Sequence, residues 1–255
     1  MSFYGPYTLL RKELRRFLRI PGQTLLGPAF TSCLYLAVFG LALAGARPES
    51  SRALGYVDFI LPGLVMLGVV SNAFLNSSSS LIGAKFSGTI VDLLVTPLGH
   101  LELTLAIVTA AAVRGLMVGV VTWCAALPFR GLGLLPHPGY AIIFPILAAV
   151  AFGAIGLITG LWAEKFEQLN IVPAFILTPL TFFAGVFYDI HALPEPWTTL
   201  SHFNPVLYLV EGMRHGLLGQ SAVDPNIGLV AFLVGDVALI AIAALLVRSG
   251  WKLRA

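Results

Sequence analysis

The chain has 255 residues, of which 58% are hydrophobic and only 11% are charged, and its formal net charge is +3. A soluble domain carries about 25% charged residues because its surface must face water. The composition therefore excludes an ordinary soluble protein and indicates an all-α membrane protein. Cys33 and Cys124 lie inside apolar runs, so neither a disulfide framework nor a metal site is expected.

Residues 3–20 are predicted to form an amphipathic helix. One face carries the apolar side chains of Tyr7, Leu10, Leu14, Phe17 and Leu18. The opposite face carries the basic side chains of Arg11, Lys12, Arg15, Arg16 and Arg19. Such a helix is expected to lie in the headgroup plane of a bilayer, either as an orientation anchor or with a functional role.

Six apolar runs follow, and we expect each to be a membrane-spanning helix. They lie near residues 25–45, 57–82, 103–127, 139–162, 169–187 and 226–247. Most Lys and Arg residues fall on the side that holds both termini, which predicts that both termini are cytoplasmic.

Several polar side chains lie within these runs. Asn72, Asn76, Ser79 and Ser80 share one face of the second run, and Thr178 and Thr181 accompany two prolines in the fifth. Polar groups in hydrocarbon need partners or water. Two interpretations stay open, packing between helices and a substrate path.

Arg114 and Asp236 place charges inside the third and sixth runs. An intramembrane charge is costly and by default marks a functional site. Their depths are similar enough for an ion pair, which we interpret as a structural lock between two helices. A proton relay is the rival interpretation.

Two short connectors are predicted to face the cytoplasm. In the first, residues 83–100, one helical face carries the apolar side chains of Phe86, Ile90, Leu93, Leu94 and Pro97, with Lys85 and Asp92 elsewhere on the wheel. So short a helix is not stable alone in water, so its apolar face must rest on lipid or dock on a soluble partner. The second connector repeats a Lys-Phe pattern and predicts a second docking elbow at Glu164, Lys165 and Phe166.

Residues 188–220 are too apolar for a solvated loop, yet Pro194, Pro196 and Pro205 forbid one continuous span. Their aromatic and histidine side chains suit a membrane interface. We expect two short re-entrant helices on the outer side, packed on protein or facing a water-filled cavity.

No catalytic or phosphate-binding motif is present in the sequence. None of its lysines follows a glycine in a G-x-x-x-x-G-K-[ST] pattern, so ATP binding by that route is not expected. The histidines lie at spacings typical of no metal site.

Four segments resemble the ABC-2 type permeases, the membrane subunits of bacterial ABC exporters. They are LRRFLRIPGQTLLGPAF, FILPGLVMLGVVSNAF, GAKFSGTIVDLLVTPL and TPLTFFAGVFYDIHALPEPWTTLSHFNPVLYLVEGMRHGLLG, and together they run over nearly the whole chain. The resemblance implies a single transmembrane domain over residues 1–255, with six transmembrane helices in the type V exporter fold. Residues 3–20 would be its connecting helix, residues 83–100 its coupling helix, and residues 188–220 its re-entrant extracellular helices.

The resemblance also implies partners. Two copies of an ABC ATPase subunit would bind ATP and Mg²⁺ and dock on residues 85–97. This chain would bind no cofactor, carry no catalytic residues and form a homodimer in the bacterial inner membrane. Lipids, polysaccharides and drugs are the substrates expected, and no nucleic acid. A secondary transporter or channel that works without an ATPase is the alternative.

Overall fold

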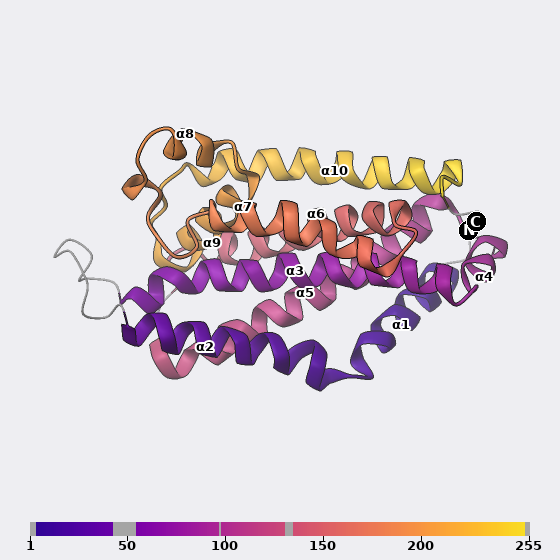
Figure 1. Cartoon of the computed structure of the whole chain (residues 1–255), viewed down its shortest axis with the longest axis horizontal. Coiled ribbons are helices and arrows are strands. Elements are labelled where there is room, and N and C mark those ends of the chain that lie inside the picture. Colours follow the sequence, from indigo (N-terminus) through magenta and orange to yellow (C-terminus); the bar gives the residue numbers. More distant parts are fainter. Residues whose placement is uncertain (1–3, 43–54, 97, 131–134, 253–255) are drawn as a thin grey trace.

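The computed structural model describes residues 4–42, 55–96, 98–130 and 135–252 (Figure 1). Helices and no strands are found in these ranges, which confirms the predicted all-helical class. The larger helices are α1 (Tyr4–Leu18), α2 (Gly27–Ala42), α3 (Tyr56–Phe86), α5 (His100–Arg130), α6 (Pro138–Trp162), α9 (Pro205–Leu218) and α10 (Pro225–Ser249). The shorter ones are η1 (Gly22–Leu26), α4 (Ile90–Val95), η3 (Phe166–Asn170), η4 (Pro173–Leu177), α7 (Thr178–Phe182), η5 (Ile190–Ala192) and α8 (Trp197–His202).

Within the described ranges, four helices are long and apolar enough to cross a membrane: α3, α5, α6 and α10. They correspond to four of the six predicted runs. The run near 25–45 corresponds to the π-helical turn η1 followed by α2, and its outer end lies outside the described residues. The run near 169–187 is an irregular helix, because 3₁₀, π and α turns succeed one another from Phe166 to Phe182. Prolines at 173 and 179 remove backbone donors there.

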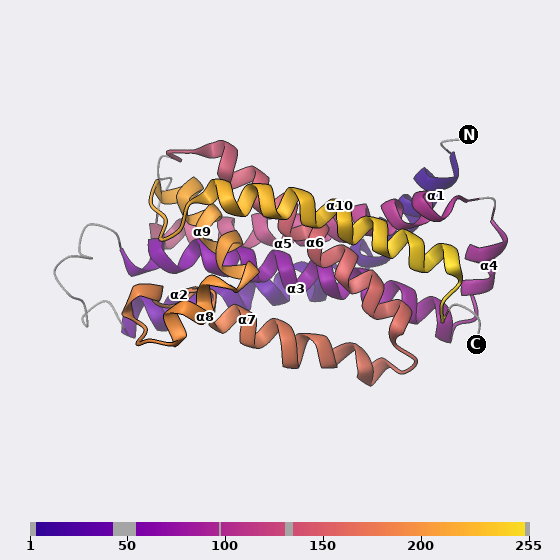
Figure 2. The same ribbon diagram turned by 90° about the horizontal axis from the view of Figure 1, so that it is seen from above.

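The helices run side by side in a bundle, and different short elements lie at its two ends. Both views place the start of α1, the end of α10 and α4 together at one end, and α8 and α9 at the other (Figures 1 and 2). The last two match the short helices predicted within residues 188–220.

Helix α3 lies at the centre, packed most extensively against α5 and α6. Glycines permit this close approach. A Cβ on Gly156 of α6 would lie 2.4 Å from the carbonyl oxygen of Phe74, and one on Gly115 of α5 would lie 2.8 Å from that of Val69. Small residues allow helix backbones to approach in this way inside membranes, where dispersion contacts drive packing.

Helix α1 buries a side against the rest of the bundle that overlaps its predicted apolar face only in part. Its buried residues are Leu9, Glu13 and Phe17, whereas Tyr7 and Leu18 of the predicted apolar face are largely exposed. A carboxylate thus lies on the buried side, and the hydrogen bond that Ser80 of α3 donates to it explains why this is tolerated.

The end of the bundle that carries α8 and α9 is held by a buried ion pair that the sequence did not reveal. Arg214 is buried and bonded to Glu211 one turn earlier on α9. Its Nη2 also donates to the carbonyl oxygen of Gly185 at 2.7 Å, and its guanidinium carbon lies 4.1 Å from the Phe59 ring centroid. Glu211 accepts from the backbone of Ala222 at 2.6 Å. The pair therefore joins α3, α9 and two loops.

Replacement of Gly156 by Ala is expected to destabilise the chain by about 1–3 kcal/mol, because the methyl group would overlap backbone that cannot move aside. Gly235→Ala in α10 is the matched control, since no atom lies within 4 Å of its added Cβ. Equilibrium unfolding in mixed micelles measures both. Equal stabilities of the two variants would contradict the close α3–α6 packing.

Replacement of Arg214 by Met is expected to lower the free energy of unfolding by about 3–5 kcal/mol, because Glu211 would remain buried without its counter-ion. The double variant Glu211→Gln/Arg214→Met should recover part of this loss. Arg248→Met, at an exposed position in α10, is the control. If Arg214→Met unfolds at the same denaturant concentration as the control, the buried pair has no such role.

Candidate functional site

The first connector lies where α3 ends, and a glycine divides it. Helix α3 continues to Phe86, the chain turns through Ser87 and Gly88, and α4 begins at Ile90. Gly88 has a φ of +72°, in the left-handed region that other residues adopt only at a cost. The turn interrupts the helical periodicity on which the predicted docking face depends.

Ile90 does not lie on the exposed face where it was predicted, because the turn at Gly88 interrupts the helix. Phe86 is 59% exposed, whereas Ile90 is 8% exposed and belongs to the same buried cluster as Leu9. Among the side chains of α4 that the structure describes, Val91 and Val95 are apolar and exposed, at 58% and 78%.

The structure describes only some of the other docking residues predicted in this connector. Asp92 is exposed on α4. The side chains of Leu93 and Leu94, and the whole of Pro97, fall outside the described residues.

The second connector lies directly beside the first. The rings of Phe86 and Phe166 have centroids 4.7 Å apart. Lys85 donates from Nζ to the carbonyl oxygens of Leu161 at 2.5 Å and Ala163 at 3.1 Å. Lys85 was predicted as a docking residue, but its ammonium group binds the carbonyls at the end of α6, where the helix dipole favours a cation.

The end of α10 joins the same region. Lys252 donates to Glu164 at 2.7 Å, and this hydrogen bond, with the charge of Lys252, lowers the pKa of the exposed Glu164 carboxyl. Lys165 is exposed beside it. Apolar and charged side chains thus share one exposed region at this end of the bundle. We call it the elbow surface, made of Phe86, Val91, Val95, Glu164, Lys165 and Phe166.

A second polar region, the polar ladder, runs along α3 at every fourth residue. Ser80 donates to Glu13 of α1 at 2.7 Å. Arg16 of α1 donates from Nη2 to Asn76, at 2.8 Å to its carbonyl oxygen and 3.2 Å to its Oδ1. Arg114 of α5 donates to Oδ1 of Asn72 at 3.4 Å. Each polar residue of this stripe therefore contacts a charged side chain from another helix.

The other residues of the predicted substrate path bond to their own helices. Ser79 donates to the carbonyl oxygen of Asn76 at 3.2 Å. Thr178 donates to that of Pro173 at 2.9 Å, and Thr181 to that of Thr178 at 2.8 Å. These bonds take up acceptors in the irregular segment that the prolines loosen.

Arg114 and Asp236 do not form the ion pair that we interpreted as a lock. Arg114 is directed at Asn72 of α3. Asp236 is 5% exposed, and neither of its carboxylate oxygens has a hydrogen-bond partner among the described residues.

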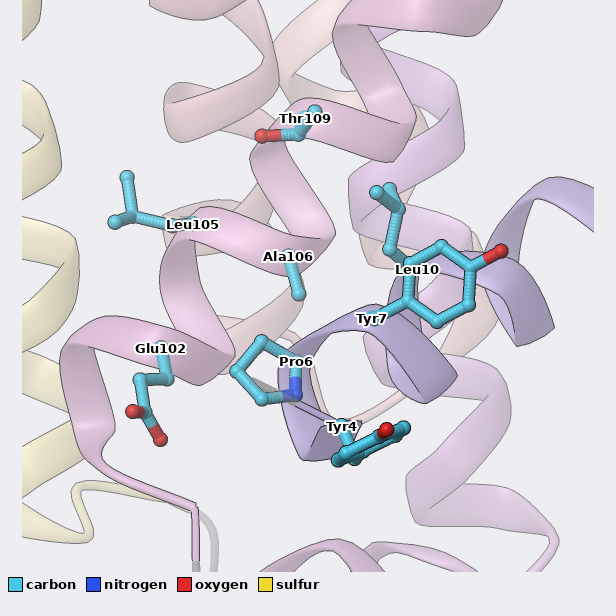
Figure 3. Close-up of a pocket in the computed structure, with 8 residues that line it drawn as sticks. All are labelled: Tyr4, Pro6, Tyr7, Leu10, Glu102, Leu105, Ala106 and Thr109. Atoms are coloured by element: carbon cyan, nitrogen blue, oxygen red, sulfur yellow. The ribbon is translucent and has the colours of Figure 1, made fainter. Parts of the chain in front are cut away.

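A groove of about 590 Å³ separates α1 from the start of α5 (Figure 3). Its walls are mainly apolar, with Tyr7 and Leu10 on one side and Leu105 and Ala106 on the other. Glu102 borders it and accepts a hydrogen bond from the backbone of Gly99 at 3.0 Å. The groove suits an apolar chain better than a polar ligand.

No group of three or more His, Cys, Asp or Glu side chains in the described ranges could hold a metal ion.

The profile of the ABC-2 type transporter family matches residues 6–218. The chain belongs to this family. The inner membrane transport permease YadH of Escherichia coli K12 is 38% identical over 247 residues, which cover 95% of this permease and 94% of YadH. Nodulation protein J of Rhizobium leguminosarum bv. trifolii is 26% identical over 208 residues, which cover 79% of this permease and 76% of that protein. These similarities confirm the resemblance found in the sequence.

Proposed function

We propose that this permease is the membrane subunit of an ATP-driven exporter, which moves a lipid-like, polysaccharide or drug-like substrate out across a bacterial inner membrane. Two copies of an ABC ATPase subunit bind ATP and Mg²⁺ in this proposal, and the permease forms a homodimer. Family membership supports the class of transporter, and the name of the YadH relative supports the membrane.

The elbow surface carries the proposal. It exposes Phe86 and Phe166 in mutual contact, and their ring faces offer the kind of aromatic anchor that dominates many protein interfaces. Lys85 ties this surface to the end of α6, while Phe86 is the last residue of α3. A partner that pulled on the surface would therefore move two central helices together.

The proposed topology has six transmembrane helices: α2, α3, α5, α6, the segment from Phe166 to Phe182, and α10. Both termini share the end with the elbow surface, so in this proposal that end is cytoplasmic (Figure 2). Helices α8 and α9 then re-enter the membrane from outside. The exposed valines of α10, at 230, 234 and 237, face lipid or the second copy.

Phe86→Asp and Val95→Asp are each expected to weaken ATPase binding about 30-fold, as for the loss of an interface anchor. Co-purification with the ATPase subunit under mild detergent and permease-dependent ATP hydrolysis measure this. Phe203→Asp is the control, because Phe203 is 82% exposed at the opposite end. Wild-type ATPase binding by both elbow variants would overturn the proposal.

A proton-coupled secondary transporter is the second candidate, and Asp236 favours it as a buried carboxyl without a partner. We expect Asp236→Asn to transport normally, since an ATP-driven exporter does not need this proton site. Uptake of a fluorescent phospholipid analogue into inverted membrane vesicles tests this. Uptake driven by a pH gradient without ATP, and lost in Asp236→Asn, would favour the second candidate.

A further inference from the structure

The polar ladder holds more positive than negative charge. It brings Arg16 and Arg114 to α3, but Glu13 is its one carboxylate among the residues described. Glu13 is already engaged, because it accepts from Ser80 and lies 3.2 Å from Arg16. Asp236 does not bond to either arginine, since its oxygens have no hydrogen-bond partner among the residues of the described ranges. Arg114 is thus left without a counter-ion among the residues described.

The polar ladder lies within the membrane, where an excess of positive charge is costly. At about 1.5 Å per residue, Asn76 and Asn72 are roughly 15 and 21 Å from the Phe86 end of α3. Helix α3 has 31 residues and is longer than the hydrocarbon layer, so both positions fall within the membrane. A cation at that depth is costly unless an anion approaches it.

The unused hydrogen-bonding atoms of the ladder are donors. Nε of Arg16, Nε of Arg114 and Nδ2 of Asn76 are all buried and have no partner within the described part of the chain, and Asn76 as a whole is 0% exposed. Arg16 contacts Asn76 and Arg114 contacts Asn72, so the two like charges meet adjacent turns of α3. Unsatisfied donors beside like charges favour an anionic acceptor, and guanidinium groups match the geometry of phosphate.

A basic hollow of about 620 Å³ on α1 gives access to Arg16. It is lined by Thr8, Arg11, Lys12, Arg15, Arg16 and Arg19, among others. The Arg16 side chain is 37% exposed, so it belongs both to this hollow and to the ladder. The hollow is large enough for a headgroup, and basic clusters at such positions attract anionic lipids.

We propose that Arg16, Arg114 and Asn76 form a binding site for the phosphate group of an anionic lipid, which enters through the basic hollow of α1. This site goes beyond the proposed function, since it does not depend on docking of an ATPase or on the identity of the transported substrate.

Native mass spectrometry of the purified full-length chain tests the site, with phosphatidylglycerol and phosphatidylcholine of identical acyl chains as probes. The wild type should bind phosphatidylglycerol about tenfold more tightly, and Arg114→Gln should lose this preference. Arg248→Gln, which removes an exposed cation far from the ladder in sequence, should keep it.

Asn76→Asp is the second variant, chosen in case Arg114→Gln does not fold. It keeps the shape of the side chain and places a carboxylate beside Arg16, so it should fold but repel phosphate. An unchanged preference in Asn76→Asp, or an equal loss in Arg248→Gln, would overturn the proposal. Full displacement of phosphatidylglycerol by millimolar inorganic phosphate would overturn its assignment to a lipid.

Discussion

Hydrocarbon offers no hydrogen-bond partner, and this constraint governs the arrangement of the helices around α3. The polar side chains at positions 72, 76 and 80 must therefore be met by other helices, and α1 and α5 supply the partners. The orientation of α1 follows from this need, because its buried face includes Glu13 as well as apolar residues. The amphipathic helix is thus held by specific polar contacts in addition to its apolar side chains.

Helix α3, which carries the polar ladder, also contributes to the elbow surface, since it ends at Phe86. Lys85 links that end to α6, and Lys252, just beyond α10, is bonded to Glu164. Force applied at the elbows would reach the ladder along one continuous helix. Glycine contacts between α3 and α6 would carry the movement as one body, because their backbones touch without intervening side chains.

Much of this architecture was predictable from apolar run length, since four predicted spans correspond to α3, α5, α6 and α10. The repeated Lys-Phe pattern predicted two similar elbows, and the structure adds that Phe86 and Phe166 of the two elbows are in contact. The burial of Ile90 was not predicted, since the helical periodicity of the docking face was extended through Gly88. A glycine between two apolar residues is a signal that could have divided that helix, and the exposed pair Val91 and Val95 would then have been considered.

By itself the sequence determined the membrane class, the long spans and the family, because these depend on composition, run length and local motifs. Only the tertiary structure decided which polar groups meet. It directs Arg114 to Asn72 and buries Arg214 against Glu211, while Asp236 has no hydrogen-bond partner in the part of the chain that the structure describes. The physical reason is that helical periodicity specifies the faces of one helix, whereas the rotation and depth of each helix relative to its neighbours depend on contacts between residues far apart in the chain.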